Sequence, residues 1–178
     1  MKKIILSLML LTGLSAITAK AQMGEAQTIK WDVSKDVTVN MSQDAVWEML
    51  NQPEMLVKAA NGYVTSIVVT DAKFPVSRDV VFANGSKRSE TIKQMEKEHK
   101  FMVIQLAEAS LPKGVKEAEF AIFTKAKGDQ SIISWTALIT GDAEGKKALM
   151  EQLKAEFDSY AAGFDKMAKN SVPAASMN

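Results

Sequence analysis

Cysteine is absent from the 178 residues of this sequence, and its absence excludes several classes of protein. The chain has no disulfide bond and no thiol chemistry, although an oxidising compartment would permit disulfides. It also lacks the cysteine to which the lipid of a lipoprotein is attached. Stability must therefore come from a hydrophobic core, and about 150 residues suffice for one such core but hardly for two.

Histidine is nearly absent as well, because His99 is the only one. It lies among Lys97, Glu98 and Lys100, in a polar turn where an imidazole is usually solvated. Without cysteine, a zinc or iron site would need several converging carboxylates, and no cluster has the spacing of metal ligands. Glycine-rich phosphate motifs and a base that could activate Ser or Thr are also missing. We therefore expect no cofactor and no metal, and we assign no catalytic residue.

Long hydrophobic runs are missing too, and the one near the N-terminus is short. Met1-Lys2-Lys3 precedes an apolar run of about 8 residues, roughly half of what a bilayer-spanning helix needs. Ala19-Lys20-Ala21 then offers small residues at both positions that determine cleavage. This pattern predicts a signal peptide at residues 1–21, cleaved near Ala21/Gln22; the alternative is a buried N-terminal helix. We expect a periplasmic or secreted protein without stable membrane insertion.

The charge balance gives no sign of a polyanionic partner. Removal of residues 1–21 takes away Lys2, Lys3 and Lys20 but no acidic residue, so the net charge changes from +1 to −2. A slightly acidic domain without a basic stripe argues against nucleic acid and against anionic membranes as partners. We expect a monomer.

Hydrophobic alternation predicts an antiparallel meander of strands. Turn signals recur every 8–20 residues from Gly62 to Asp129 without helical periodicity between them, and Asn84-Gly85 is a strong hairpin signal. The first strand is expected within residues 28–41, and six more at 64–69, 78–82, 89–95, 101–107, 118–124 and 131–139.

Three helices are expected around these strands. Ser42 is a candidate N-cap for a short helix through Leu50, and Pro53 can begin a second one that runs to Ala60. A long amphipathic helix is predicted from Lys146 to Ala168, with one apolar stripe. The stripe consists of Leu149, Leu153, Phe157, Tyr160, Phe164 and Met167. With no repeat and no linker, the chain is divided into the signal peptide, one domain at residues 22–170 and a flexible tail at residues 171–178.

This order of elements predicts an α+β fold in which a curved antiparallel sheet is closed by the long C-terminal helix. The ordered series resembles the START-related helix-grip superfamily (SRPBCC), in particular its polyketide cyclase/dehydrase and lipid-transport-like branch. The residues that carry the resemblance are Val37 to Leu50, the pattern Arg78-x-Val80-x-Phe82-x-Asn84-Gly85-x-x-x-x-Glu90, Leu111-Pro112 and Ile133-x-Trp135. The resemblance covers about residues 28–168 and implies a helix-grip fold with a cavity between sheet and helix.

Arg78 and Glu90 form the one polar pair that stands out in this pattern. The hairpin places their strands side by side, and whether they share a face depends on loop length and bulges. One interpretation is a polar anchor that grips a ligand carboxylate or carbonyl through Arg78. The other is an ion pair of small consequence. The candidate cavity lining consists of Arg78, Val80, Phe82, Glu90, Ile92, Phe120, Ile122, Ile133, Trp135, Ala137, Phe157, Tyr160 and Phe164.

Three functions remain open from these residues. The first is extracytoplasmic binding or transport of a small hydrophobic or amphipathic ligand, such as a lipid, quinone, polyketide or aromatic metabolite. The second is a polyketide cyclase/dehydratase-like or hydrolytic enzyme that acts in the same cavity through Glu90 or Arg78. The third is an interaction module with a collapsed cavity. A raised pKa of Glu90 within the cavity would favour the enzyme.

Overall fold

The computed structural model describes residues 29–171. The predicted signal peptide, its cleavage site and residues 172–178 of the predicted tail lie outside the described residues. Within the described part, no helix combines the length and the hydropathy needed to cross a bilayer.

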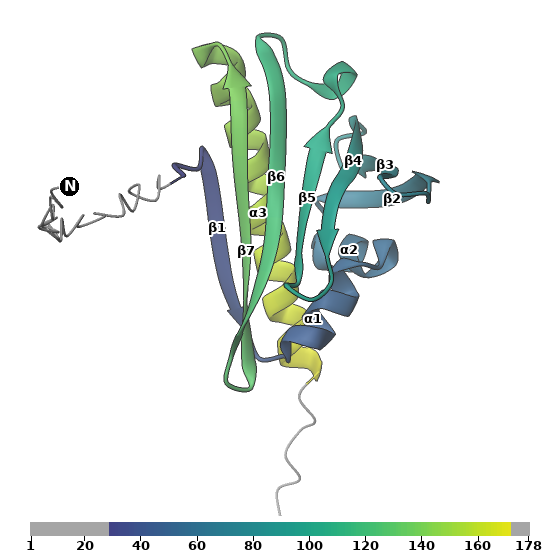
Figure 1. The fold of residues 1–178 in the computed structure, drawn as a ribbon, viewed down its shortest axis with the longest axis vertical. Helices are drawn as coiled ribbons and strands as arrows, with labels where there is room; N and C mark the ends of the chain where they lie inside the picture. The colour runs from purple at the N-terminus through teal and green to yellow at the C-terminus, as the bar shows by residue number, and fades with distance from the viewer. Residues whose placement is uncertain (1–28, 172–178) are drawn as a thin grey trace, which may run out of the picture.

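One seven-stranded antiparallel sheet forms the body of the molecule (Figure 1). Its strands follow the order β1-β7-β6-β5-β4-β3-β2, so that the first strand pairs with the last and the others form a meander. The strands are β1 (Val33–Val39), β2 (Val64–Asp71), β3 (Val76–Phe82), β4 (Lys87–Glu96), β5 (Phe101–Leu106), β6 (Val115–Lys127) and β7 (Gln130–Gly141). A short 3₁₀ helix, η1 (Glu108–Ser110), lies between β5 and β6. The predicted meander and its Asn84-Gly85 hairpin are thereby confirmed, with Gly85 at a φ of +82°.

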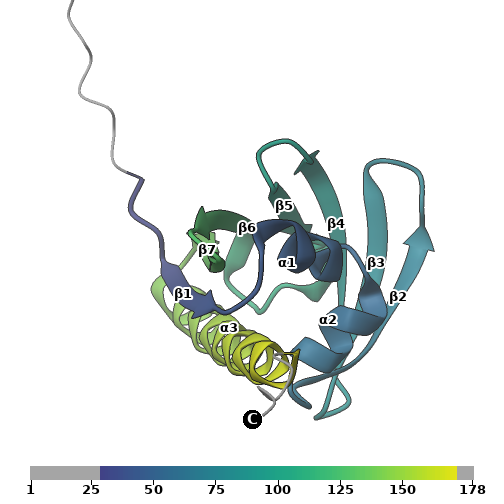
Figure 2. The same cartoon turned by 90° about the horizontal axis from the view of Figure 1, so that it is seen from below.

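The sheet curls around a concave face that the long helix α3 (Ala143–Ser171) closes (Figure 2). Side chains alternate across each strand, so every second residue points to this face. In β7 the inward positions include Ile133, Trp135 and Ala137, each exposed by 1% or less. The core is the layer between the concave face and α3.

Helix α3 begins three residues earlier and ends three residues later than the sequence predicts. Asp142 explains the earlier start, because its Oδ1 accepts a hydrogen bond from the backbone N–H of Gly145 at 2.7 Å. A carboxylate at this position satisfies a free N–H of the first turn and interacts well with the helix dipole. The predicted apolar stripe faces the sheet, with Leu149, Leu153 and Phe164 at 0–1% exposure.

Two short helices, α1 (Gln43–Leu50) and α2 (Pro53–Ala59), follow β1; α2 packs against α3, and α1 packs against α2 and the ends of β6 and β7 (Figure 2). Ser42 caps α1 as predicted, with its Oγ accepting from the backbone N–H of Ala45 at 3.3 Å. At Gly163 of α3, a Cβ atom would lie 1.8 Å from the carbonyl oxygen of Ala59. Glycine is therefore required for the close approach of α2 and α3.

The strand boundaries differ from the predicted ones mainly in length. β1 is shorter than residues 28–41, since it begins at Val33 and ends at Val39. β6 and β7 are longer, because their ends extend beyond the buried core into polar segments such as Lys125–Lys127. Hydrophobic alternation locates the buried part of a strand but not its solvent-exposed ends.

Candidate functional site

Arg78 on β3 and Glu90 on β4 are directly opposite each other in the sheet register. Both side chains therefore point to the same face, which is the concave one. Arg78 Nε donates to Glu90 Oε2 at 2.9 Å, and Nη2 lies 2.8 Å from the same oxygen. Their exposed fractions are 7% and 2%, so the pair is an interior ion pair and not a surface one.

Two further charged residues, which the sequence analysis missed, complete a network around this pair. Arg88 precedes Glu90 by two residues on β4, and its Nε donates to Glu90 Oε1 at 2.8 Å. Arg88 Nη2 also contacts that oxygen. Glu156 of α3 then accepts two hydrogen bonds from Arg88, from Nη1 at 2.7 Å and from Nη2 at 2.8 Å. The result is a buried, formally neutral cluster of two arginines and two glutamates that ties β3 and β4 to α3.

The apolar stripe predicted for the long helix does not include Glu156, yet the structure places this residue on the buried face of α3. Glu156 is 2% exposed. It sits three residues after Leu153 and four before Tyr160, which is the spacing of one helix face. Arg88 is the reason that a carboxylate is tolerated there, since a buried charge needs a partner with good geometry.

The two carboxyl groups of the network have opposite pKa shifts. Burial alone would raise the pKa of Glu90, but Arg88 and Arg78 together outweigh burial, and the pKa is lowered below its usual value. Burial raises the pKa of Glu156, Arg88 offsets only part of this, and repulsion from Glu90 adds to the rise. Glu90 is therefore not the high-pKa acid that the enzyme hypothesis would need.

Aromatic side chains fill the other half of the concave face. The ring of Trp135 lies 6.1 to 6.5 Å from the rings of Phe157, Tyr160 and Phe164. Phe120 contacts Phe157 with 5.6 Å between ring centroids. Packing of this kind fills space that a ligand could otherwise occupy.

The structure brings all thirteen predicted lining residues to one layer, the concave face and the facing side of α3. Four of them also border pockets that open to the surface: Phe82, Arg78 and Ile92, and Phe120. The other nine lie in the packed core, and a role for them in ligand binding stays a prediction. These nine are Val80, Glu90, Ile122, Ile133, Trp135, Ala137, Phe157, Tyr160 and Phe164.

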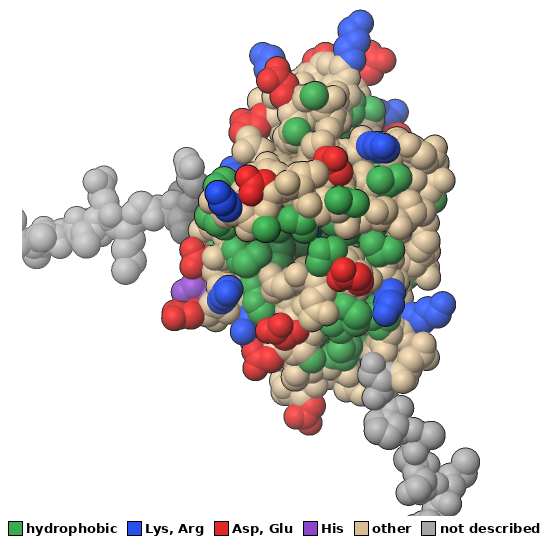
Figure 3. All heavy atoms as spheres, turned by 90° about the vertical axis from the view of Figure 1, so that its right-hand side faces the viewer, with side chains coloured by type: hydrophobic (Ala, Val, Ile, Leu, Met, Phe, Trp, Pro, Cys, Tyr) green, Lys and Arg blue, Asp and Glu red, His purple; other side chains and the backbone are tan. Residues whose placement is uncertain are grey.

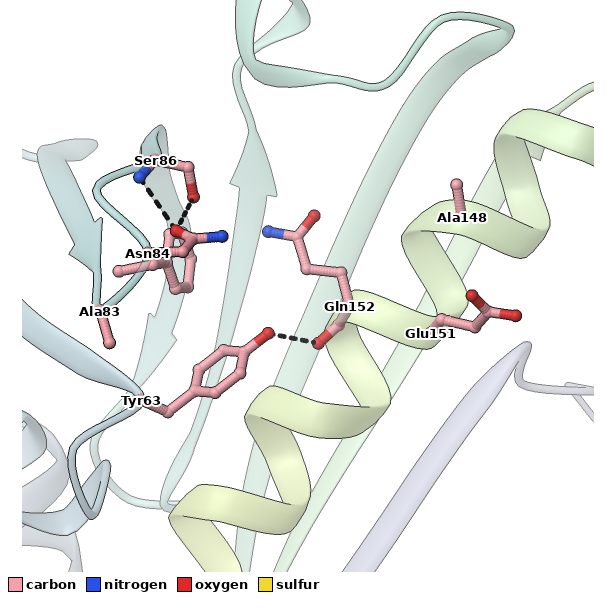
Figure 4. Close-up of a pocket in the computed structure, with 8 residues that line it drawn as sticks. Tyr63, Ala83, Asn84, Ser86, Ala148, Glu151 and Gln152 are labelled. Carbon is pink, nitrogen blue, oxygen red and sulfur yellow. Dashed lines mark hydrogen bonds between the residues drawn. The ribbon is translucent and has the colours of Figure 1, made fainter.

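A pocket here called the hairpin cleft lies between the β3–β4 hairpin and the first half of α3 (Figure 4). Its volume is about 530 Å³, within the range of roughly 300–1,000 Å³ that is typical of small-molecule sites. It is lined by Tyr63, Phe82, Ala83, Asn84, Ser86, Ala148, Glu151 and Gln152.

Aromatic and polar groups meet in the hairpin cleft. Tyr63 and Phe82 pack edge to face, with 5.7 Å between their ring centroids. Burial, and then the charge of Glu156, raises the pKa of Tyr63, so its hydroxyl stays neutral and donates to the Gln152 carbonyl at 3.3 Å. The side-chain amides of Asn84 and Gln152 extend into the space from opposite walls (Figure 4). The cleft can thus hold an apolar ring and hydrogen-bond its polar substituents.

Acid–base and metal chemistry have few candidates in the described residues. His99 is exposed in the turn between β4 and β5, as expected. Within residues 29–171, no group of three or more His, Asp or Glu side chains could hold a metal ion.

Comparison with solved structures shows the same fold in several proteins. XoxI from Bacillus cereus superposes with a TM-score of 0.67 at 13% identity, covering 78% of this chain and 95% of that one. Norcoclaurine synthase from Thalictrum flavum, in complex with dopamine and hydroxybenzaldehyde, superposes with a TM-score of 0.62 at 18% identity, covering 79% and 87% of the two chains. The di-domain ARO/CYC protein BexL of the BE-7585A biosynthetic pathway matches with a TM-score of 0.64 at 9% identity, over 75% of this chain and 45% of that one.

Comparison at the level of sequence adds no relative. No protein-family model matches the chain, and no curated protein matches it significantly. The element order, the closing helix and the structural matches together show that the chain has the helix-grip fold, as the sequence predicts.

Proposed function

We propose that this protein binds a small amphipathic molecule outside the cytoplasm, with an apolar or aromatic body and polar substituents. The hairpin cleft is the observation that carries the proposal. It has the volume of a small-molecule site, an aromatic pair as one wall, and amide and hydroxyl groups at its rim. The N-terminal Lys2-Lys3 segment, the short apolar run and Ala19-Lys20-Ala21 support export.

The hydrogen bonding of the buried carboxyl groups favours binding without catalysis. General acid–base catalysis needs a group that can exchange a proton with a substrate. Glu90 and Glu156 instead accept hydrogen bonds from Arg78 and Arg88, and neither lines the hairpin cleft. Tyr63 and Glu151 are the titratable side chains that line it; the pKa of Tyr63 is raised, and Glu151 is exposed on α3.

An enzyme acting in the same layer is the second candidate, and one observation favours it. Norcoclaurine synthase, which has this fold, holds dopamine and hydroxybenzaldehyde in its structure. Glu156 is the carboxyl group of the network whose pKa is raised, by burial and by repulsion from Glu90. An enzyme of this kind would require α3 to move away from the sheet, because Glu156 is only 2% exposed and a substrate could not otherwise reach it.

The proposal is tested by filling the cleft from the helix side. We expect the neutral fluorescent probe N-phenyl-1-naphthylamine to bind the wild type with a dissociation constant near 1 μM, about −8 kcal/mol. Ala148 lines the cleft and is exposed on α3, so Ala148→Trp should weaken binding at least tenfold without unfolding the chain. Ala155 is an exposed alanine of the same helix that borders none of the pockets described above, so Ala155→Trp serves as the matched control. Equal loss in both variants, or no binding to the wild type, would contradict the proposal.

A further inference from the structure

A second, smaller pocket lies at the other end of β3, away from the hairpin. It is enclosed between the α1–α2 junction and the paired ends of β2, β3 and β4, and its volume is about 140 Å³. This is well below the roughly 300–1,000 Å³ of sites for drug-sized ligands, so an occupant would be the size of a short or single-ring acid. It is here called the Arg78 pocket.

The lining of the Arg78 pocket is apolar with one charge. Leu56, Val69, Val76 and Ile92 are among its seven apolar members, and the other two lining residues are Asn51 and Arg78. The Asn51 amide Nδ2 donates to the Trp47 carbonyl at 2.7 Å. Arg78 is thus the one charged residue in the lining of this small pocket, and Glu90, its partner in the neutral network, does not line it.

The guanidinium of Arg78, which lines this pocket, retains hydrogen-bonding capacity. An arginine carries five N–H donors. In the described part of the chain Arg78 contacts Glu90 through Nε and Nη2, and no partner is recorded there for Nη1. Nη1 is also not fully buried. Among the described residues, Thr136 Oγ1 is the only fully buried side-chain nitrogen or oxygen atom without a hydrogen-bond partner, so an unpaired Nη1 must be accessible.

The protein surface around the opening of the Arg78 pocket is apolar, which suits a ligand with an anionic group and an apolar body. Val69 lines the pocket and is 41% exposed, and Phe74, between β2 and β3, is 62% exposed. Figure 3, which views the side of the molecule that carries β2, shows hydrophobic side chains gathered across the middle of this face with charged ones around them. A molecule held at Arg78 can therefore continue over apolar surface.

From these observations we infer that the Arg78 pocket is a binding site for a small apolar monocarboxylate. The carboxylate accepts hydrogen bonds from the free N–H groups of Arg78, and the apolar body packs against Val69, Val76 and Ile92. Charge-assisted hydrogen bonds of this kind are stronger than neutral ones. The site is separate from the hairpin cleft, since the two share no lining residue. A test of this site is therefore independent of a test of the function proposed above.

Benzoate and benzamide are matched probes for this site, because they have nearly the same shape and differ in charge. In a ¹H–¹⁵N NMR titration of the full chain at pH 7, benzoate should shift the Arg78 Nε–Hε signal and the amides of Val76 and Ile92. Its dissociation constant should be at least tenfold lower than that of benzamide. Equal affinities, or no shift at these residues, would overturn the proposal.

Two neighbouring valines provide a variant and its control without disturbing the charge network. Val69→Trp should fill the mouth of the pocket and weaken benzoate binding at least tenfold. Val68 is also exposed on β2 but does not line the pocket, so Val68→Trp should leave the affinity within twofold of the wild type. If Val68→Trp weakens benzoate binding as much as Val69→Trp does, the proposed site is also wrong. Neither variant should change the affinity of N-phenyl-1-naphthylamine for the hairpin cleft, which keeps the two proposals distinguishable.

Discussion

Arg88 and Glu156 are 68 residues apart in the sequence and meet in the interior with two parallel hydrogen bonds. Arg88 Nη1 and Nη2 donate to the two carboxylate oxygens of Glu156 at 2.7 and 2.8 Å. Their side chains are 2% and 3% exposed. Since Arg88 also holds Glu90, this contact fixes α3 relative to the β3–β4 hairpin, and thereby the two walls of the hairpin cleft.

Removing one member of this pair should be costly. Arg88→Met leaves Glu90 with Arg78 alone and leaves Glu156 buried without its partner, so we expect a loss of about 3–5 kcal/mol in the free energy of unfolding. The double variant Arg88→Met, Glu156→Leu should recover part of this loss, because no uncompensated charge remains at position 156. Urea denaturation measures both values.

An exposed ion pair on the same helix is the control for that experiment. Lys154 and Asp158 are 73% and 38% exposed and lie one helical turn apart. Lys154→Ala should change the free energy of unfolding by no more than about 0.5 kcal/mol. A loss in Arg88→Met as small as this would mean that the network does not hold the fold together.

The pH dependence of stability should separate Glu90 from Glu156. The pKa of Glu90 is lowered from 4.5, so the stability it contributes is present above pH 4.5 and is lost as the pH falls through its folded-state pKa. The pKa of Glu156 is raised from 4.5, so its contribution is present below pH 4.5 and is lost as the pH rises through its folded-state pKa. Each group contributes a slope of up to about 1.4 kcal/mol per pH unit in its own window.

A ¹³C NMR titration of the glutamate carboxyl carbons tests this assignment directly. One buried glutamate should titrate below pH 4.5 and should disappear from the spectrum of Glu90→Gln. Another should titrate above pH 4.5 and should disappear in Glu156→Gln. The assignment is wrong if the Glu156→Gln variant loses the low-pH resonance instead.

The apolar stripe of α3 yields a prediction for packing. Phe157 is 1% exposed and contacts both Phe120 and Trp135. Phe157→Ala should therefore destabilise the fold by about 3–5 kcal/mol, the usual cost of a cavity left by a buried aromatic residue. Phe123, which is only partly buried, provides the comparison, and Phe123→Ala should cost clearly less. A loss below about 1 kcal/mol in Phe157→Ala would indicate that the stripe borders open space.

The export hypothesis predicts a processed N-terminus. The extracytoplasmic protein should have the intact mass of a chain that starts at Gln22 or within a few residues of it. Leu8→Arg interrupts the apolar run and should leave a full-length chain in the cytoplasm, whereas Lys20→Arg, which keeps the charge, should still be processed. A full-length wild-type chain in the cytoplasm would refute export.

The fold could be predicted from the sequence because its local signals agree with one another. Ser42 as N-cap, the Asn84-Gly85 hairpin and the stripe from Leu149 to Met167 each indicate one element, and the structure contains all three. The ends of elements were less predictable. Asp142 caps α3 before the apolar stripe begins, and the polar ends of β6 and β7 have no hydrophobic alternation.

The candidate site was only partly predictable, because the partners of a buried charge come from distant parts of the chain. Arg78 and Glu90 could be paired through the hairpin between them. Arg88 could also have been placed beside Glu90, since a residue two positions earlier on a strand shares the same face. The hairpin cleft could not be predicted from Phe82 alone, because its opposite wall depends on where α3 crosses the sheet, and Ala148 and Gln152 are unremarkable in sequence.

Native mass spectrometry of the protein purified from the extracytoplasmic fraction of its own host tests most directly whether the protein carries a small molecule outside the cytoplasm. We expect a chain beginning near Gln22 with an additional mass of one small organic molecule, which is lost under denaturing conditions. N-Phenyl-1-naphthylamine should displace that molecule one for one, and much less readily in Ala148→Trp than in Ala155→Trp. A bare chain under both native and denaturing conditions, with no adduct after the probe is added, would contradict the proposed binding function.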